Sequence, residues 1–541
     1  MRHSTRLGVP ALLLAALVGF AGCAQRYDIV IESATIYDGS GGEPFAADLG
    51  IKDGRIQTIG EIKPNADVVI DARNFYVAPG FIDIHNHAVF SESEREELSY
   101  EPDWNEMKTA RNYLTQGVTT VVSGNCGSGP HTVKELFEHM RQIGIGVNVI
   151  ELVGHGTVRR AVMGMEDRAP TAEEMERMKQ MVAEAMEGGA AGLSTGLFYP
   201  PGCYAKTAEV IELARLVREY GGIYASHVRD EGTNDMGGVL ASMQEAVRIG
   251  KEAGVPVQIA HLKAGGKPAW GMAAEITAVF EEAQSSGLRI YADQYPYTAG
   301  STNLASIVLP RWFLAGGKLK EKVIDPALVA RVRAEVAQRV DTYGGAEAIV
   351  IAYSSKKPEW VGKNVQQLSQ EMALSPADAA IEMFKIDDPQ VVVFMMKDED
   401  MEYFMKKPYV MTSSDGLNVP YGIGQPHPRN YGAFTRKIRV YVLDRKLISM
   451  EQAIRAATSL PAEMLGLEDR GRIQEGYAAD LVVFDPRTIR DRATYTEPHQ
   501  YSEGIEYVLV NGRVAIDKGT YNGTLAGQPL PHRPGLPAGR R

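Results

Sequence analysis

The sequence predicts an α/β protein built on a TIM (β/α)₈ barrel, with a small β-domain formed by both chain ends and an inserted α/β subdomain. Three observations support this prediction. Short apolar runs alternate with helical patterns through most of the chain, these runs number eight, and similar β-rich patterns occur near both ends. Strands that alternate with helices form parallel βα units, and eight such units close into a barrel.

The composition is that of an ordinary globular protein. Hydrophobic residues make up 44% and charged residues 23% of the 541 positions, so the chain can bury a large core and form more than one domain. The formal net charge is −11 at pH 7. This acidic balance argues against nucleic-acid binding, which usually requires a basic face. We therefore expect a small-molecule ligand and no nucleic-acid partner.

Residues 1–22 are typical of an export signal of the lipoprotein type. Two arginines precede an apolar run at 11–20, which is too short to span a bilayer comfortably and follows the charge order of a secretory signal. The next residues, Phe20-Ala21-Gly22-Cys23, are similar to a bacterial lipobox, in which the cysteine is lipidated. Plain secretion is the alternative. In both cases we expect an exported protein, periplasmic or held at the membrane only through a lipid on Cys23.

Residues 24–80 and 466–520 are expected to build the small β-domain together. An Asp-Gly hairpin turn, which needs positive φ at both central residues, occurs near the N-terminus, and an Asn-Gly turn repeats the pattern near the C-terminus. The stretches that carry the strand signal are 51–56, 479–484 and 508–514. The tail at 521–541 has little apolar periodicity, so we expect it to be poorly ordered.

The barrel is expected between residues 81 and 465. Its candidate strands are 80–85, 118–123, 146–153, 191–195, 222–227, 256–261, 289–294 and 408–413. Helical patterns of suitable length separate them, for example 171–187, 207–220 and 236–253. The active site of such a barrel lies at the carboxyl ends of its strands.

The interval between the seventh and eighth strands, 302–407, is too long for a structureless loop. It carries its own helical patterns, at about 326–340 and 376–385, and its own strand patterns, at 348–353 and 391–394. We interpret it as an inserted subdomain that covers the barrel mouth.

Two histidines end the first predicted strand. His85 and His87 are two residues apart, and such residues point to the same face of a strand. Both imidazoles therefore face the barrel axis. Alone this is a weak signal, because many such pairs are surface or core histidines.

Similar side chains follow four other predicted strands. Cys126 follows the second strand, His227 ends the fifth, His261 ends the sixth, and Asp415 follows the eighth. Thiolate, neutral imidazole and carboxylate are the groups that bind Zn²⁺ in proteins. Each residue alone has an equally good structural explanation, but their joint placement at one end of one barrel predicts a metal site.

Only three cysteines occur in the chain, Cys23, Cys126 and Cys203. A barrel of this size does not need a disulfide for stability. Cys126 is therefore expected to be free for chemistry.

These strand ends resemble the amidohydrolase superfamily over residues from about 27 to 515. Many binuclear members use a carboxylated lysine as the bridging ligand, whereas Gly124-Asn125-Cys126-Gly127 is similar to the bridging cysteine of the N-acyl-D-amino-acid deacylases, or D-aminoacylases. Other motifs agree with this group: Ser194-Thr195-Gly196-Leu197-Phe198-Tyr199, Ser226-His227-Val228-Arg229-Asp230-Glu231, His261-Leu262-Lys263, Tyr295-Pro296-Tyr297-Thr298-Ala299-Gly300-Ser301 and Pro426-His427-Pro428-Arg429.

The resemblance implies one tight zinc site and a second, weaker one. The residues of the tight site would be Cys126, His227 and His261. The residues facing the second site would be His85, His87 and Asp415, with Cys126 shared.

The resemblance also implies residues that handle a substrate carboxylate, namely Lys263, Tyr295, Ser301 and Arg429. Their chemistry is suitable, because a carboxylate is best held by a lysine charge, hydroxyl donors and a bidentate guanidinium. For Lys263 and Arg429, a solvated rim or an internal salt bridge is the alternative. Tyr199 is placed to polarise a carbonyl or simply to pack at the barrel mouth.

The expected activity is zinc-dependent hydrolysis of N-acyl-D-amino acids, with Asp415 as the group that takes and returns the proton. A related peptidase that cleaves dipeptides with a C-terminal D-residue is the first alternative. A lipoprotein that binds a ligand without turnover is the second. The intact cluster disfavours the latter, because a scaffold has no need of Asp415 beside the histidines.

Overall fold

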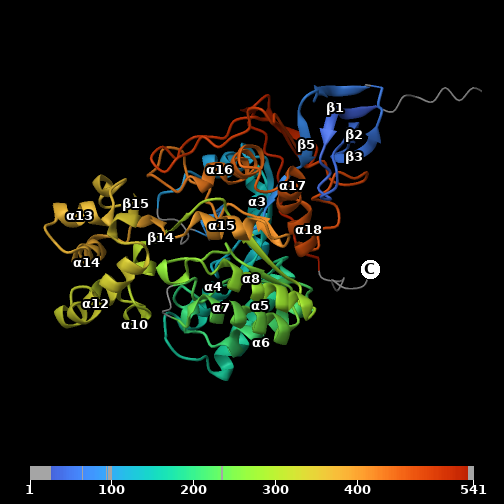
Figure 1. Cartoon of the computed structure of the whole chain (residues 1–541). Coiled ribbons are helices and arrows are strands. Elements are labelled where there is room, and N and C mark those ends of the chain that lie inside the picture. Colours follow the sequence, from blue (N-terminus) through green and yellow to red (C-terminus); the bar gives the residue numbers. More distant parts are fainter. Residues whose placement is uncertain (1–25, 64, 93, 95–99, 233–235, 534–541) are drawn as a thin grey trace, which may run out of the picture.

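A parallel β-barrel occupies the middle of the molecule (Figure 1). The computed structural model describes residues 26–533, apart from 64, 93, 95–99 and 233–235. The barrel strands follow in chain order: β6 (Phe81–Asp83), β7 (Val118–Ser123), β8 (Asn148–Glu151), β9 (Val153–Gly154), β10 (Gly192–Gly196), β11 (Ile223–His227), β12 (Val257–Ile259), β13 (Ile290–Gln294) and β17 (Val410–Thr412). This arrangement confirms the predicted fold class.

The third predicted strand, 146–153, is divided between two sheets. β8 pairs with β7, whereas β9 pairs with β10. The sheets also meet where the first and last barrel strands end, because the Asp415 N–H donates to the His85 carbonyl and the His87 N–H donates to the Gly416 carbonyl, both at 2.8 Å. These bonds join the barrel at the end that carries the predicted metal ligands.

Helices cover the outside of the barrel. The longer ones are α3 (Val133–Ile143), α5 (Ala172–Glu187), α6 (Thr207–Glu219), α7 (Gly238–Ala253), α8 (Ala273–Ser285), α15 (Asp398–Met405), α16 (Arg429–Arg436) with the π-helical η6 (Lys437–Asp444), α17 (Met450–Ala457) and α18 (Ser459–Leu465). α5 shows why they form: Thr171 and Glu174 make a capping box, and Met178, Val182 and Ala185 are buried at helical spacing.

Further helices lie in the loops of the barrel. They are α1 (Trp104–Met107), α2 (Arg111–Leu114), α4 (His155–Met163), η2 (Gly202–Tyr204) and η3 (Lys267–Ala269). α4 begins directly after β9, so a helix N-terminus faces the carboxyl end of the barrel.

Both chain ends contribute to one β-sheet beside the barrel. Its strands are β1 (Tyr27–Ile36), β2 (Phe45–Lys52), β3 (Arg55–Gly60), β4 (Ala66–Asp71), β5 (Tyr76–Pro79), β18 (Leu481–Phe484), β19 (Ile505–Val510), β20 (Arg513–Asp517) and β21 (Thr520–Tyr521). The two ends join where β5 pairs with β18. Asp53 and Gly54 have φ of 49° and 74°, and Asn511 and Gly512 have 49° and 75°, as the predicted turns require.

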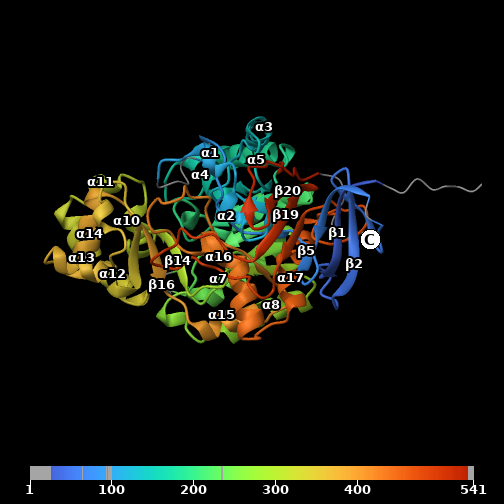
Figure 2. The ribbon, with the colours of Figure 1, turned by 90° about the horizontal axis from the view of Figure 1, so that it is seen from above.

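The inserted subdomain has its own sheet and core. Its sheet has the order β14 (Ala299–Asn303), β16 (Gln390–Phe394) and β15 (Ile349–Tyr353). Its helices are α9 (Leu304–Val308), α10 (Arg311–Leu314), α11 (Leu319–Lys322), α12 (Pro326–Thr342), α13 (Val365–Glu371) and α14 (Pro376–Ile386), with the short η4 (Ala346–Ala348) and η5 (Pro358–Trp360). Figure 2 shows this subdomain and the β-domain at opposite ends of the molecule, with the barrel between them.

α15 belongs with the barrel helices, although the predicted insertion included it. Asp400 in its first turn accepts the backbone N–H groups of Gly271 and Ala273 at 2.7 and 3.2 Å, which ties α15 to the start of α8. The subdomain sheet begins earlier than predicted, at Ala299.

The expectation of a poorly ordered tail was wrong for residues 521–533. Val149 of β8 donates to the Gln528 carbonyl at 3.1 Å and accepts from the Leu530 N–H at 2.8 Å, and the His532 N–H donates to the Gly189 carbonyl at 2.9 Å. Backbone hydrogen bonds need no apolar periodicity, so this order left no signal in the sequence. Residues 534–541 lie outside the described part of the chain.

The predicted signal segment, 1–22, and Cys23 also lie outside the described residues. Across the part of the chain that the structure describes, no helix combines the length and the apolar character that a membrane crossing requires.

Candidate metal centre

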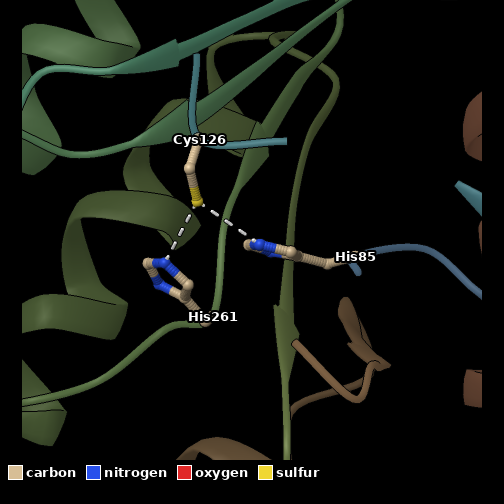
Figure 3. Close-up of side chains that lie close together, drawn as sticks. All are labelled: His85, Cys126 and His261. Carbon is tan, nitrogen blue, oxygen red and sulfur yellow. Dashed lines mark hydrogen bonds between the residues drawn. The ribbon is translucent and has the colours of Figure 1, made fainter. Parts of the chain in front are cut away.

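Cys126 lies at the centre of a cluster at the carboxyl end of the barrel. Its Sγ is 3.5 Å from His85 Nε2, 3.6 Å from His227 Nδ1 and 3.6 Å from His261 Nε2. Figure 3 shows the thiol and two of these imidazoles pointing toward one another from different strands. The structure thus brings together side chains that are as much as 176 residues apart in the sequence, His85 and His261, whose ring centroids are 4.8 Å apart.

These distances fit a tetrahedral zinc ion. With Zn–S near 2.3 Å and Zn–N near 2.0–2.1 Å, a tetrahedral angle separates sulfur from nitrogen by about 3.6 Å. The three observed sulfur–nitrogen distances are 3.5–3.6 Å. The donor set is therefore suitable for zinc. Among the described residues, His85, Cys126 and His261 place their ligand atoms within 4.8 Å of one another.

A second group of ligand-type atoms adjoins the first. Asp415 Oδ1 is 3.5 Å from His85 Nε2 and 3.3 Å from His87 Nε2. Nitrogen and oxygen ligands of one tetrahedral zinc ion lie about 3.4 Å apart by the same geometry. His85 takes part in both groups, so the cluster is spaced for two neighbouring metal positions.

The backbone is strained where three of these side chains are attached. Cys126, His261 and Asp415 have positive φ values of 54°, 35° and 49°. Positive φ is uncommon for residues other than glycine and tends to cluster at functional sites. Gly127 follows Cys126 in a tight turn, where an added Cβ would lie 2.6 Å from the Gly196 backbone nitrogen. Only glycine fits this position, which explains the Cys-Gly pair in the motif.

The electrostatics of the cluster favour a bound cation. Burial alone would raise the pKa of the Cys126 thiol, but the facing imidazoles, His85 first among them, lower it well below its usual value. Burial would also lower the pKa of His85, yet the charges of Asp293, Cys126 and Asp415 raise it to about 10. The anionic groups around His85 thus favour a positive charge at this position, which a divalent cation would supply.

Two acidic residues of the cluster were missed in the sequence. Asp293 is the last residue but one of β13, is fully buried, and places Oδ1 3.2 Å from His85 Nδ1. Glu231 follows β11 and places Oε1 3.1 Å from His261 Nδ1. Both had a signal: Asp293 lies one residue before the end of a predicted strand, and Glu231 stands four residues after His227 in a motif already singled out.

The two predicted substrate cations form internal salt bridges in this structure. Arg429 Nη1 donates to Asp415 Oδ2 at 2.6 Å. Lys263 Nζ lies 2.6 Å from both Glu231 Oε1 and His261 Nδ1. Both cations therefore contact possible metal ligands directly, Arg429 through Asp415 and Lys263 through His261. Burial would raise the pKa of Asp415, but Arg429 and the imidazoles hold it well below its usual value.

The predicted hydroxyl groups differ in how close they lie to these cations. The Tyr295 ring is 4.8 Å from the Arg429 guanidinium carbon, and its buried hydroxyl has no hydrogen-bond partner among the described residues. Ser301 lies on β14 after Gly300, and it is Gly300 whose side faces the Tyr295 hydroxyl. Successive residues of a strand face opposite sides, so the described contacts do not bring Ser301 to either cation. The Tyr199 ring packs against the His227 ring at 4.8 Å, and its hydroxyl accepts from Thr302 at 3.4 Å.

The barrel and this cluster define a class of protein, the metal-dependent barrel hydrolases. Comparison with known proteins agrees. The model of the amidohydrolase family matches residues 68–306 and 399–516, leaving out most of the inserted subdomain. D-aminoacylase from Alcaligenes xylosoxydans xylosoxydans is 34% identical over 531 residues, which cover 94% of this chain and 98% of the relative.

Solved structures show the same relationship. One is the N-acyl-D-glutamate deacylase of Bordetella bronchiseptica, which was solved with zinc and a phosphonate that mimics the tetrahedral intermediate of the reaction. Its sequence is 32% identical to this chain and its structure matches with a TM-score of 0.79. The match covers 94% of this chain and all of that one. A D-aminoacylase studied for its binuclear metal centre is 31% identical with a TM-score of 0.78 and the same coverage.

The chain belongs to the amidohydrolase family. This confirms the resemblance found in the motifs and makes the chain an enzyme, a metal-dependent amidohydrolase. It also removes the alternative of a lipoprotein that binds without turnover.

Cys126→Ala is expected to lose most bound zinc and nearly all activity, because the variant lacks the one thiolate that faces three imidazoles. Metal analysis of the purified variant after zinc loading measures the loss. Cys203→Ala is the matched control, since burial raises the pKa of that thiol to about 11 and it faces none of the cluster imidazoles in the described hydrogen bonds. Unchanged zinc content in Cys126→Ala would contradict the assignment.

Proposed function

We propose that this enzyme hydrolyses the amide bond of N-acyl-D-amino acids, with zinc, and releases a carboxylate and a free D-amino acid. One observation carries the proposal: Asp415 Oδ1 faces the imidazoles of His85 and His87, and Asp415 Oδ2 accepts from the Arg429 guanidinium. A carboxylate suited to proton transfer and a cation suited to a substrate carboxylate thus both lie beside the cluster of possible metal ligands. The names of the similar proteins, D-aminoacylase and N-acyl-D-glutamate deacylase, support the substrate class.

The residues expected to hold zinc are Cys126, His227 and His261 in the tight site, with His85, His87 and Asp415 at the second. When bound, zinc lowers the pKa of a coordinated water and polarises the amide carbonyl. Asp415 takes the proton of the attacking water and passes it to the departing amine, without which the tetrahedral intermediate would revert. Because Arg429 keeps Asp415 ionised, its carboxylate is ready to act as the base.

Arg429 and Lys263 are suited to hold the α-carboxylate of the substrate. Arg429 uses Nη1 for Asp415, and its buried Nε has no hydrogen-bond partner among the described residues. A guanidinium carries five N–H donors, so it can bind Asp415 and a substrate together. Tyr295, whose ring contacts Arg429, is expected to add a hydroxyl donor, and Ser301 another. Tyr199, whose ring packs against that of His227, is expected to polarise the scissile carbonyl.

Asp415→Asn should keep the fold and the zinc of the tight site while kcat falls by about 10²–10⁴-fold, the usual contribution of a general acid–base group. The amide retains an oxygen for the metal but cannot accept the proton. Steady-state kinetics with zinc analysis of the same sample checks this. A variant with near wild-type kcat would show that another group moves the proton.

Lys263→Ala should lower kcat/KM for N-acyl-D-amino acids by an amount equivalent to about 1.5–3 kcal/mol, the value of a charged hydrogen bond. Analogues whose carboxylate is amidated should be poor substrates of the wild type and little affected by the substitution. Assays with N-acetyl-D- and L-amino acids, their amides, and dipeptides with a C-terminal D-residue test the proposal. Equal turnover of L-substrates or amides would contradict it, and preferential cleavage of the dipeptides would favour a peptidase.

We also propose that the enzyme acts outside the cytoplasm, as a lipoprotein anchored at Cys23. The charge order and lipobox-like residues of 1–23 support this. In cell fractionation, the wild type should accompany the membranes, and Cys23→Ser should be released or left unprocessed. A wild-type product found wholly soluble would instead indicate ordinary secretion.

A further inference from the structure

Glu231 contacts three functional groups of the site with one carboxylate oxygen, and the proposed reaction gives it no role. Its Oε1 is 2.6 Å from Lys263 Nζ, 3.1 Å from His261 Nδ1 and 3.7 Å from His227 Nε2. Its side chain is only 12% exposed. The residue follows His227 on the loop after β11, so it reaches the imidazoles from the side opposite Cys126.

His227 and His261 each have one ring nitrogen toward Cys126 and the other toward Glu231. His227 turns Nδ1 to the sulfur and Nε2 to the carboxylate, whereas His261 turns Nε2 to the sulfur and Nδ1 to the carboxylate. We call the first nitrogen of each ring the inner nitrogen and the second the outer nitrogen. The inner nitrogen is Nδ1 in His227 and Nε2 in His261, but in both residues it faces the sulfur. The Glu231 carboxylate lies beside both outer nitrogens.

A metal bound at the inner nitrogens determines where each ring carries its hydrogen. A neutral imidazole that gives one lone pair to a metal carries its hydrogen on the other nitrogen, and that buried N–H needs an acceptor. The Glu231 carboxylate is such an acceptor. The ammonium of Lys263 is not, because it has donors only.

Lys263 lies beside the same carboxylate and the same ring. Its Nζ is 2.6 Å from Glu231 Oε1 and 2.6 Å from His261 Nδ1. The Glu231 carboxylate therefore lies where it can accept from the ammonium and from the outer N–H of His261 together.

We propose that Glu231 is a positioning residue: it accepts the outer N–H of His261 at 3.1 Å and faces that of His227 at 3.7 Å, so that both rings present their inner nitrogens to the metal. Lys263 pairs with the same carboxylate. This inference rests on the proposed zinc site.

The loop that carries Glu231 is held independently of its side chain. The Glu231 carbonyl accepts the Gly265 N–H at 2.8 Å, and the neighbouring Asp230 accepts the backbone N–H groups of Gly232, Met236 and Gly238 at 2.9–3.1 Å. Replacing the Glu231 side chain therefore leaves the bonds that shape the loop in place.

Zinc affinity, measured by competition with a chromogenic chelator, tests the proposal without any substrate. Glu231→Leu should bind zinc about 10–100-fold more weakly, the usual effect of removing the partner of a ligating histidine. Glu231→Gln should lie between it and the wild type, because its amide oxygen still accepts. Lys263→Met should bind at least as tightly as the wild type, because it removes a positive charge beside the metal and leaves the Glu231 carboxylate next to the outer nitrogens.

Two further variants separate this role from a structural ion pair. In Glu231→Leu combined with Lys263→Met, no charge is left unpaired, yet the outer nitrogens still lack the acceptor, so weak zinc binding should persist. Glu245→Gln is the matched control: Glu245 is also 12% exposed and paired with an arginine, Arg229, at 2.8 Å, but lies outside the cluster. Its affinity should equal that of the wild type.

Wild-type affinity in Glu231→Leu, or its recovery in the double variant, would overturn the proposal. Zinc loss in Lys263→Met equal to that of Glu231→Leu would overturn it as well. The proposed substrate is judged separately: wild-type protein that binds zinc but leaves N-acyl-D-amino acids intact would refute the proposed function while the Glu231 measurements still stand.

Discussion

The site depends on the burial of an ionised thiol among imidazoles. Burying a charge is costly unless it is paired, so the Cys126 thiolate must be surrounded by groups that stabilise it. The barrel supplies them because the carboxyl ends of parallel strands converge at one end of the fold. His85 follows β6, His227 ends β11 and His261 lies in the turn after β12, and each presents a ring nitrogen 3.5–3.6 Å from the sulfur.

The charges around this centre form two groups, one on each side. On one side Asp415 joins the imidazoles of His85 and His87 to Arg429, and on the other Glu231 joins those of His227 and His261 to Lys263. Each carboxylate thus links a pair of imidazoles to a cation. Because these contacts are buried and direct, a metal, a proton-transfer group and a substrate anion would influence one another strongly.

The sequence contained the fold and the ligand-type residues, because both leave local signals. Apolar runs located every barrel strand, and His85, His87 and Asp415 could be placed by their positions at strand ends. The pairing of Arg429 with Asp415 and of Lys263 with Glu231 left no such signal, since it joins side chains of different loops whose directions only the folded backbone sets. The order of residues 521–533 was missed for a related reason: it depends on backbone hydrogen bonds to β8, which no side-chain pattern records.

X-ray absorption at the zinc edge of the loaded protein tests the central claim most directly, because it identifies the atoms bound to the metal. We expect one sulfur at about 2.3 Å together with nitrogen or oxygen at about 2.0–2.2 Å in the wild type, and loss of the sulfur contribution in Cys126→Ala. A wild-type spectrum with nitrogen and oxygen ligands alone would contradict a centre built on the Cys126 thiolate.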